Sequence, residues 1–367
     1  MTVNDSSGLE VAKRHIETFS LVIYCLITVA GTLGNGLVIY VTGFKMKRTV
    51  NSVWFLNLAI ADFLFTTFLI FTTVSLHWDE WPFGNFMCKL SSLVNVINMF
   101  ASVFLLMAIS VDRCLSIWVV VWAQNKRTVC KAQIICAVIW VTAGICSTPY
   151  ATFRTVEQFS SYEYDDYVYD SNISMKSYCI YPSTMASESH FSLIIFRFVM
   201  GFLIPFLVIL VSYVAIAIRA RHLQRTRRRR SHWIIVAVIL TFFICWLPFH
   251  ILSFIESNAK QDLQVIVIVG GPLTVSLAYM NSCLNPILYV FMCDEFQKKI
   301  KQSICLVLES ALAEDRMSFA SSRSLSSWVP RKSSTVVAFE GKDANTSTES
   351  KAVYTERTQS MEENMNK

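Results

Sequence analysis

The chain has 367 residues, of which 54% are hydrophobic and only 16% are charged, and its formal net charge is +6. Soluble domains carry roughly a quarter charged residues, so a chain this apolar could not solvate its surface in water. The composition excludes a disordered chain, a collagen and a nucleic-acid-binding domain as descriptions of the whole protein.

Seven apolar runs are long enough to cross a hydrocarbon core of about 30 Å, which takes about 20 helical residues. In chain order they cover residues 19–44, 53–76, 90–111, 132–147, 191–218, 233–254 and 265–292. None alternates polar and apolar residues like a membrane β-strand, and backbone groups in lipid must be satisfied within the segment, so each is expected to be a helix. The sequence predicts an all-α membrane protein, a seven-transmembrane helix bundle over residues 19–292.

Charge divides the connecting loops into two sets. Lysines and arginines follow spans one, three, five and seven, at positions that include Lys45, Arg48, Lys126, Arg127, the run Arg227 to Arg230, and Lys298. The opposite loops are acidic, above all the long loop before span five. Because short cytoplasmic loops carry an excess of lysine and arginine, we expect a multi-pass plasma-membrane protein with residues 1–18 extracellular and the carboxyl terminus cytoplasmic.

Several modification sites are expected on the extracellular side. Asn4 and Asn172 begin glycosylation sequons. Cys88 and Cys179 fall in the oxidising compartment and can form a disulfide. Tyr164 and Tyr167 lie among acidic residues and suit sulfation, although such a run can equally be a solvated loop without modification.

The chain beyond span seven has two parts. Residues 293–308 read as a short amphipathic helix on the inner leaflet, in contact with membrane lipids, and Cys305 at its end is a palmitoylation candidate. Residues 309–367 are polar and rich in serine and threonine, so we expect a disordered cytoplasmic tail. Its cluster Ser318 to Ser327 is a predicted target of receptor kinases, and the added charge would recruit arrestin.

Polar side chains inside a span are costly, so each is a functional candidate. Asp62 lies near the centre of its span, where an uncompensated carboxylate would neutralise itself or attract a cation. Oxygen ligands that suit a sodium ion come from Asn98, Ser102, Asn281 and Asn285. The alternative is a purely structural hydrogen-bond network. No other cofactor is expected.

Arg197 lies within span five, and no acidic residue nearby in sequence could pair with it. Arg154, at the outer end of span four, could face the same cavity, and two guanidinium groups would hold a carboxylate by charge-assisted hydrogen bonds. Further ligand-binding candidates are Asn95, Glu256 and Tyr279. The alternative is that Arg197 snorkels towards the surface or pairs with Glu256 alone.

Proline can kink four of the spans, because it removes a helical hydrogen bond at Pro149, Pro205, Pro248 and Pro286. The kinks are either points of rotation or static features of the packing.

Short motifs occur in order along all seven spans. They are Gly34-Asn35, Asn57 to Asp62, Asp112-Arg113-Cys114, Trp140, Pro205 with Tyr213, Cys245 to Pro248, and Asn285 to Tyr289. Over residues 19–304 this ordered set resembles the rhodopsin-like G-protein-coupled receptors. Residues 44–57, 81–84, 98–106, 121–125 and 285–292 are also similar to the chemoattractant receptors, and among these most similar to the chemerin receptors.

The resemblance implies roles for residues on the cytoplasmic half of the bundle. G-protein coupling and its switch would involve Asp112, Arg113, Tyr213, Phe242, Trp246, Pro248 and Tyr289. Asp112 would restrain Arg113 at rest, and Arg113 would then meet the carboxyl-terminal helix of the G protein. Trp246 would pack against Phe242 and respond to ligand, unless it is only a large core side chain.

The resemblance also implies a function. We expect a receptor for a peptide or small-protein chemoattractant, chemerin-like, that signals through an inhibitory-type G protein and arrestin. A carboxylate-bearing lipid mediator stays open as the ligand, since Arg197 would serve either anion. A seven-helix channel or transporter is the alternative from another class, and neither an enzyme nor a nucleic-acid partner is expected.

Overall fold

The computed structural model describes residues 3–162, 173–182, 184–222, 229–257 and 263–292. The predicted amphipathic helix 293–308 and the tail 309–367 lie outside these residues. So do four predicted modification sites, Tyr164, Tyr167, Asn172 and Cys305.

The described chain is mostly helical. In order, its elements are α1 (Val3–Tyr40), the π-helix η1 (Val41–Lys45), α2 (Val50–Trp78), α3 (Gly84–Trp118), α4 (Val120–Asn125), α5 (Val129–Phe153), β1 (Thr155–Tyr162), β2 (Ile173–Ile180), α6 (Ser187–Phe198), the π-helix η2 (Val199–Leu203), α7 (Ile204–His222), α8 (Arg229–Ser257) and α9 (Gln264–Met292). Seven helical stretches of this described chain are long and apolar enough to cross a membrane, which confirms the predicted seven-span bundle.

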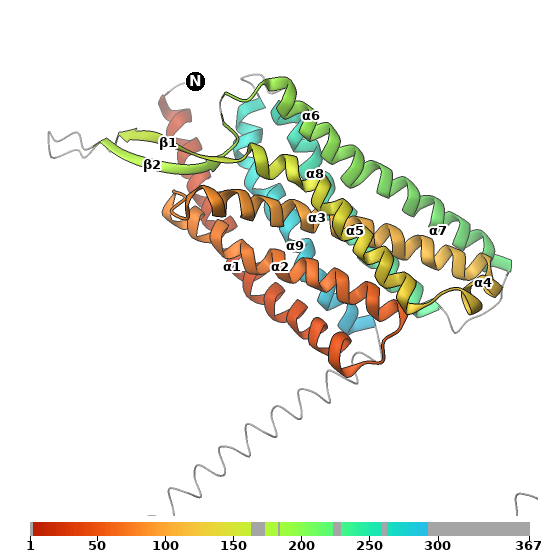
Figure 1. Cartoon of the computed structure of the whole chain (residues 1–367). Helices are drawn as coiled ribbons and strands as arrows, with labels where there is room; N and C mark the ends of the chain where they lie inside the picture. The colour runs from red at the N-terminus through yellow and green to blue at the C-terminus, as the bar shows by residue number, and fades with distance from the viewer. Residues whose placement is uncertain (1–2, 163–172, 183, 223–228, 258–262, 293–367) are drawn as a thin grey trace, which may run out of the picture. The chain divides into compact units, whose positions relative to one another are not determined.

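The long helices run side by side, with the strands at one end of the bundle and α4 at the other (Figure 1). We call these the hairpin end and the α4 end. Helix α3 packs against α2, α5 and α7, while α1 packs against α2 and α9. Phe100, Val103 and Leu105 of α3 are fully buried in the resulting core.

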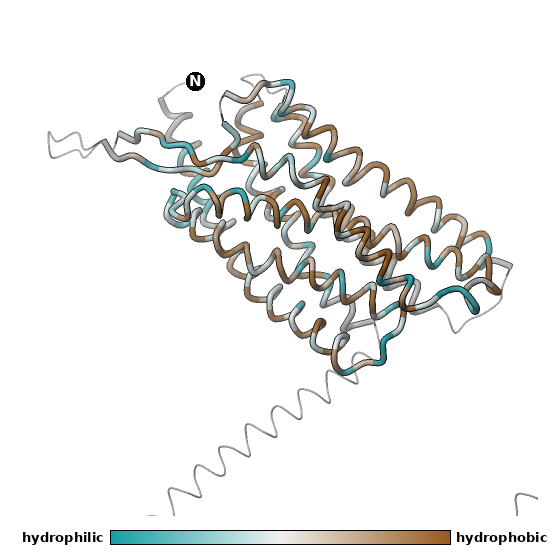
Figure 2. Tube along the Cα trace, in the orientation of Figure 1, coloured by the Kyte–Doolittle hydropathy of each residue, from teal (hydrophilic) through white to brown (hydrophobic). Residues whose placement is uncertain are grey.

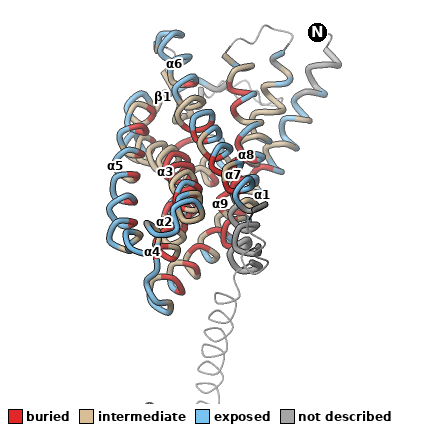
Figure 3. The backbone as a smooth tube through the Cα atoms, turned by 90° about the vertical axis from the view of Figure 1, so that its right-hand side faces the viewer, coloured by how far each residue is buried: buried red, intermediate tan, exposed pale blue. Residues whose placement is uncertain are grey.

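The outer surface of the bundle is apolar. Hydrophobic residues run along the middle of the helices (Figure 2), and much of α5 is exposed (Figure 3). Among its exposed side chains are Ile134, Val138, Val141 and Ile145. An exposed apolar stripe of this length is expected where a helix faces lipid.

Strands β1 and β2 form an antiparallel pair, with Thr155 opposite Ile180 and Tyr162 opposite Ile173. This hairpin lies in the long loop before the fifth span, outside the helical bundle that the sequence predicts and the seven helices confirm. Each strand has only eight residues of mixed polarity, so a search for long apolar runs does not detect it.

Helix α1 begins at Val3, whereas the predicted span begins at residue 19. The extension is polar, and local interactions support it: Lys13 and Glu17 form an i,i+4 pair at 3.7 Å, and Thr18 donates to the carbonyl of Arg14 at 2.9 Å. An apolar-run criterion locates the membrane-embedded part of a helix and misses such a continuation. The expected extracellular segment 1–18 is therefore helical from Val3 onwards.

The π-helix η2 ends at Leu203, two residues before Pro205. Proline has no N–H to donate to the carbonyl four residues earlier, which is that of Gly201, and a wider turn accommodates this loss. A Cβ at Gly201 would lie 2.9 Å from Met99 Cε and 3.3 Å from Phe100 Cε1, so glycine allows α3 to approach closely. The other predicted kink residues, Pro149, Pro248 and Pro286, lie inside α5, α8 and α9.

Candidate functional site

A disulfide ties the hairpin to the bundle. Cys88 in the first turns of α3 is bonded to Cys179 of β2, with their Cα atoms 5.6 Å apart, which confirms the predicted bridge. Every other cysteine in the described part of the chain is free. The hairpin is therefore held over the end of α3.

The hairpin also contacts the end of α2. Lys176 donates to the carboxylate of Asp79 at 2.8 Å, Tyr178 donates to the same oxygen at 3.2 Å, and the Trp81 backbone N–H donates to the Ser177 carbonyl at 2.6 Å. Burial raises the pKa of the Tyr178 phenol, and the negative charge of Asp79 adds to this shift. These bonds hold β2 against the α2–α3 connection.

A cavity of about 220 Å³ lies beneath the hairpin. Its walls come from α2, α3, α9 and β2, and include Phe65, Phe68, Leu69, Ser91, Ser92, Asn95, Tyr178, Cys179, Ile180 and Tyr279, with Arg154 from the end of α5. Phe65, Phe68 and Leu69 of α2 give the cavity an apolar face, whereas other α2 residues, α3 and Arg154 supply hydrogen-bonding groups. Such a mixture is typical of a ligand pocket.

Three of the five predicted ligand-binding residues line this cavity: Arg154, Asn95 and Tyr279. The Asn95 amide donates to the Tyr279 hydroxyl at 3.0 Å and so links α3 to α9. Arg197 and Glu256 do not line the cavity, and Glu256 is exposed.

Arg154 terminates α5 as its C-cap residue. Its Nη1 donates to the carbonyl of Cys179, and its guanidinium lies 4.6 Å from the centre of the Tyr181 ring. Its Nε is buried without a hydrogen-bond partner among the described residues. Backbone and aromatic contacts therefore hold this cation at the cavity wall.

Arg197 lies in the last turn of α6, on the side of the bundle formed with α8. Its Nη2 donates to Ser253 at 3.2 Å, and its guanidinium carbon lies 4.6 Å from the Phe249 ring and 5.9 Å from the Tyr150 ring. No described carboxylate lies within 4.0 Å of Arg197 or of Arg154. The predicted alternative of a pair between Arg197 and Glu256 is therefore not formed.

Trp246 is buried among aromatic side chains of α8. Its ring centroid lies 5.9 Å from Phe242, as predicted, and 5.7 Å from Phe249. His250 of α8 is fully buried beside this cluster, with its ring centroid 6.2 Å from that of Trp246 and 5.1 Å from that of Phe202. Because residues four apart share a helix face, His250 and Trp246 lie on the same side of α8. A continuous aromatic contact therefore joins the surroundings of Arg197 to Trp246.

The predicted sodium residues gather around a fully buried carboxylate. Asn285 donates to Asp62 at 2.7 Å, and Asn98 donates to the other carboxylate oxygen at 3.1 Å when its amide is turned towards it. In the opposite orientation the Asn98 amide oxygen accepts from Ser102 at 3.3 Å.

Ser282 also belongs to this cluster, 3.0 Å from Asn98, and was missed because serine is common in apolar helices. Asn281 is buried, and its Oδ1 has no partner among the described residues. The described chain contains no group of three His, Cys, Asp or Glu side chains suited to a metal. The side chains around Asp62 carry amide and hydroxyl oxygens, and oxygen ligands of this kind suit a hard monovalent cation.

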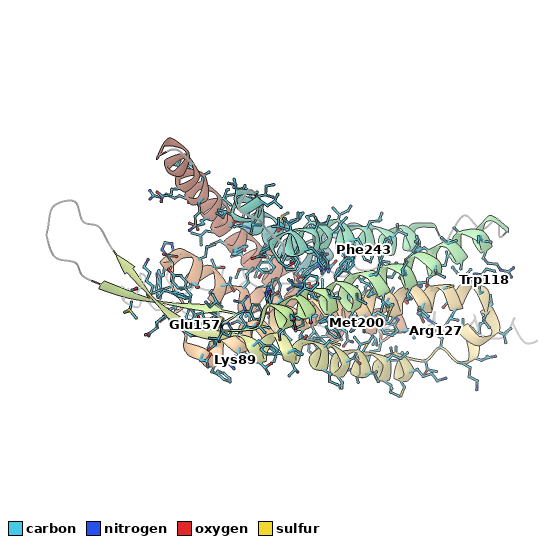
Figure 4. All side chains as sticks on the ribbon, turned by 90° about the horizontal axis from the view of Figure 1, so that it is seen from above. Lys89, Trp118, Arg127, Glu157, Met200 and Phe243 are labelled. Carbon is cyan, nitrogen blue, oxygen red and sulfur yellow. A yellow bond between two sulfur atoms is a disulfide. The ribbon has the colours of Figure 1, made fainter. Side chains whose placement is uncertain are left out.

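Arg127 lies at the α4 end of the bundle, near Trp118, whereas Lys89 and Glu157 lie at the hairpin end (Figure 4). Further charged residues accompany Arg127. The carboxylate of Asp112 accepts two hydrogen bonds from Arg127, each 2.8 Å long. Arg113 donates to Asn51. Both carboxylate oxygens of Asp112 are thus bonded to Arg127, and the restraint of Arg113 by Asp112 stays a prediction.

The other predicted switch residues are in helices. Tyr213 of α7 packs against the main hydrophobic core, and Pro248 lies two residues after Trp246 in α8. Asn4 and Tyr289 lie in α1 and α9, and their side chains are outside the described set.

A seven-helix bundle of membrane-spanning length, with a disulfide-bonded hairpin over a cavity and a charged cluster at the opposite end, is the architecture of a multi-pass membrane protein. Residues 34–289 match the family described as "7 transmembrane receptor (rhodopsin family)". The chain belongs to this family of plasma-membrane receptors, which are not enzymes and which act between an extracellular ligand and a G protein.

Individual relatives are similar over most of the chain. It is 41% identical to chemerin-like receptor 1 of Sus scrofa over 312 residues, 82% of this chain and 84% of the relative. It is 38% identical to the C3a anaphylatoxin chemotactic receptor of Oncorhynchus mykiss, over 85% of this chain and 84% of the relative. It is 36% identical to the prostaglandin D2 receptor 2 of Mus musculus, over 82% of this chain and 79% of the relative. The expected resemblance to chemoattractant receptors is confirmed.

Proposed function

We propose that this protein is a receptor for a peptide or small-protein chemoattractant, chemerin-like, and that it signals through an inhibitory-type G protein and arrestin. Its similarity to chemerin-like receptor 1 and to the C3a anaphylatoxin chemotactic receptor supports this class of ligand. In this proposal the hairpin end is extracellular and the α4 end cytoplasmic, as the distribution of lysine and arginine favours.

The observation that carries the proposal is a pair of arginines without a carboxylate partner among the described residues. Arg154 lies at the cavity wall beneath the hairpin. Arg197 lies on the α6–α8 side, where it rests on the face of Phe249. A guanidinium kept from water gains most from an anionic partner that completes its hydrogen bonds. We propose that the terminal carboxylate of a peptide is that partner, with Asn95, Tyr279 and Glu256 as further contacts.

The size of the cavity favours a ligand of which only one end enters it. Its volume of about 220 Å³ is below the roughly 300–1,000 Å³ of pockets for drug-sized molecules. The end of a longer chain fits this space better than a whole drug-sized molecule. A carboxylate-bearing lipid mediator is the second candidate, because the prostaglandin D2 receptor 2 is among the relatives and Phe65, Phe68 and Leu69 give the cavity an apolar face.

Transmission of the signal is proposed to run from the aromatic contacts around Trp246 to Arg113. Phe242 and Pro248 would move with α8 as it opens the cytoplasmic side, and Tyr213 of α7 and Tyr289 of α9 would then swing in towards Arg113. The cluster around Asp62 is proposed to hold a sodium ion that favours the resting arrangement. Receptor kinases and arrestin would act on the tail 309–367.

The remaining modification sites are proposals as well. Asn4 and Asn172 would be glycosylated, Tyr164 and Tyr167 sulfated, and Cys305 palmitoylated where residues 293–308 meet membrane lipids.

A ligand screen tests the proposal. Cells that express the receptor are exposed to chemerin-type carboxyl-terminal peptides, formyl peptides, complement fragments and eicosanoids, and cAMP and calcium are recorded. Each peptide is supplied both as the free acid and as the amide. We expect a response to a free-acid peptide that pertussis toxin abolishes. A response confined to eicosanoids would replace the peptide with the lipid candidate.

A further inference from the structure

The hairpin of β1 and β2 leaves one edge of its sheet without a partner strand. In the described part of the chain the sheet has two strands, and their register is regular from Thr155 opposite Ile180 to Tyr162 opposite Ile173. The strands project past α2 and α3 at the hairpin end of the bundle (Figure 1). A two-stranded hairpin by itself is only marginally stable, so a further strand added to its free edge would stabilise it.

The hydrogen bonds of β2 show in which direction the backbone groups of β1 point. In an antiparallel pair, residues that exchange both hydrogen bonds with the partner alternate with residues whose N–H and C=O groups point away from it. The carbonyl of Ser177 accepts from the backbone N–H of Trp81, which lies outside the hairpin, so the backbone groups of Ser177 point away from β1. Gln158 lies opposite Ser177, and its N–H and C=O groups therefore point away from β2. By the same alternation those of Ser160 also point away, whereas those of Phe159 point towards β2.

The two edges of this sheet differ in what covers them. The outer edge of β2 is covered at Ser177 by the α2–α3 connection, through Trp81. No described residue outside the hairpin bonds to the backbone of Gln158 or Ser160, and both side chains are exposed. Edge strands of natural proteins are commonly protected by proline, lysine or a bulge. Strand β1, with the sequence TVEQFSSY, has none of these, as expected of an edge that receives a partner.

The free edge begins at the rim of the cavity. Arg154, which lines the cavity, directly precedes Thr155, the first residue of β1. A peptide whose terminal carboxylate lies at Arg154 would leave the cavity beside the first residues of β1. Its chain would then run towards its own amino end while β1 runs towards Tyr162, so the two would be antiparallel. Gln158 follows Arg154 at a distance of about 13 Å in an extended chain, which the last few residues of a peptide can span.

We propose that an extended segment of the peptide ligand adds to β1 as a third, antiparallel strand, and that the backbone groups of Gln158 and Ser160 supply the hydrogen bonds. This inference rests on the proposed function, because it takes the free-acid peptide as the partner. Main-chain hydrogen bonds of this kind give affinity, whereas pockets for side chains give specificity. The segment along β1 would therefore be recognised by its extended backbone, and specificity would depend on the terminal residues in the cavity.

Binding of a chemerin-type carboxyl-terminal peptide tests this mode of recognition. The probe is a free acid of about 12 residues, long enough to extend from the cavity along β1, and its Kd is measured on full-length receptor in nanodiscs. Gln158→Pro and Ser160→Pro each remove one outward N–H, a change that an edge strand tolerates. Each should raise the Kd about threefold to tenfold, the net effect of one hydrogen bond. Gln158→Ala keeps the N–H and should bind like wild type.

Two further measurements test the geometry from each side. Phe159→Pro removes an N–H that points towards β2, so it should lower the melting temperature of the receptor, whereas Gln158→Pro should leave that temperature unchanged. On the peptide, single N-methyl groups are placed on residues about four to eight from the carboxyl end. The Kd should rise at every second position, because alternate N–H groups of an added strand point towards β1.

Four results would overturn the proposal. A wild-type Kd for both Gln158→Pro and Ser160→Pro would exclude strand addition. A loss for Gln158→Ala as large as that for Gln158→Pro would assign the contact to the side chain. Melting temperatures of both variants as low as that of Phe159→Pro would contradict the assigned register, and N-methyl effects without alternation would exclude pairing along β1.

The proposed function has a separate outcome in this experiment. In each of the four results the peptide still binds to wild type, so the proposed peptide ligand stands and only the added strand is lost. A peptide that does not bind to wild type would contradict the proposed ligand, and this inference with it.

Discussion

Gly31 should be intolerant of even one added methyl group, because α1 and α2 touch there. A Cβ built at Gly31 would lie well inside van der Waals contact with Cγ2 of Thr66 and 3.0 Å from its Cβ. Thr66 is fully buried and β-branched, so its side chain cannot rotate away freely. Gly31→Ala must therefore push α1 and α2 apart.

Gly144 of α5 provides a matched control, since an added Cβ there meets nothing within 4 Å. Alanine at Gly144 should stabilise its helix by about 0.5–1 kcal/mol, because glycine loses more backbone entropy on folding. Overpacking at Gly31 costs about 1–3 kcal/mol. The two variants should consequently melt at least about 2 °C apart.

Thermal unfolding of purified receptor in one detergent measures this difference. Thr66→Ser removes the Cγ2 atom that Gly31→Ala would meet and keeps the hydroxyl, so the double variant should regain most of the lost stability. If Gly31→Ala melts as high as Gly144→Ala, or if Thr66→Ser restores nothing, the contact between α1 and α2 is not as tight as described.

Three further predictions concern the sodium cluster, the disulfide and the tail. Sodium at about five times its Kd should stabilise the receptor by about 1 kcal/mol relative to potassium, and Asp62→Asn should remove this difference; equal melting of wild type in both salts would contradict the sodium site. Cys179→Ser should reduce stability by about 2–4 kcal/mol and lower surface expression, and a wild-type melting temperature would exclude a stabilising bridge. Truncation at Met317 should abolish arrestin recruitment while G-protein activation continues, so unchanged recruitment would place the arrestin sites elsewhere.

The seven spans and the disulfide were predictable because each depends on a local property of the sequence. A span needs a length of apolar chain that the bilayer thickness fixes. Cys88 and Cys179 were singled out because the order of spans places both on one side of the membrane. The cluster around Asp62 followed from the cost of an isolated carboxylate in lipid.

What the sequence could not predict depends on contacts between distant segments. The bonds from Arg127 to Asp112 come from another segment of the chain, which adjacent charges in the sequence do not indicate. The strands β1 and β2 depend on pairing across a polar connection. The separation of Arg197 from the cavity beneath the hairpin depends on how α6 packs against α8.

Binding of a free-acid peptide agonist and its amide to wild type and to Arg197→Met tests the central proposal most directly. The substitution keeps an unbranched stem beside Phe249 and removes only the guanidinium. Loss of one partner of a buried charge pair should weaken the free acid by about 2–5 kcal/mol. The amide should already bind weakly to wild type and lose little more on the variant. Equal losses for acid and amide, at matched surface expression, would contradict the carboxylate anchor and leave Arg197 with a structural role.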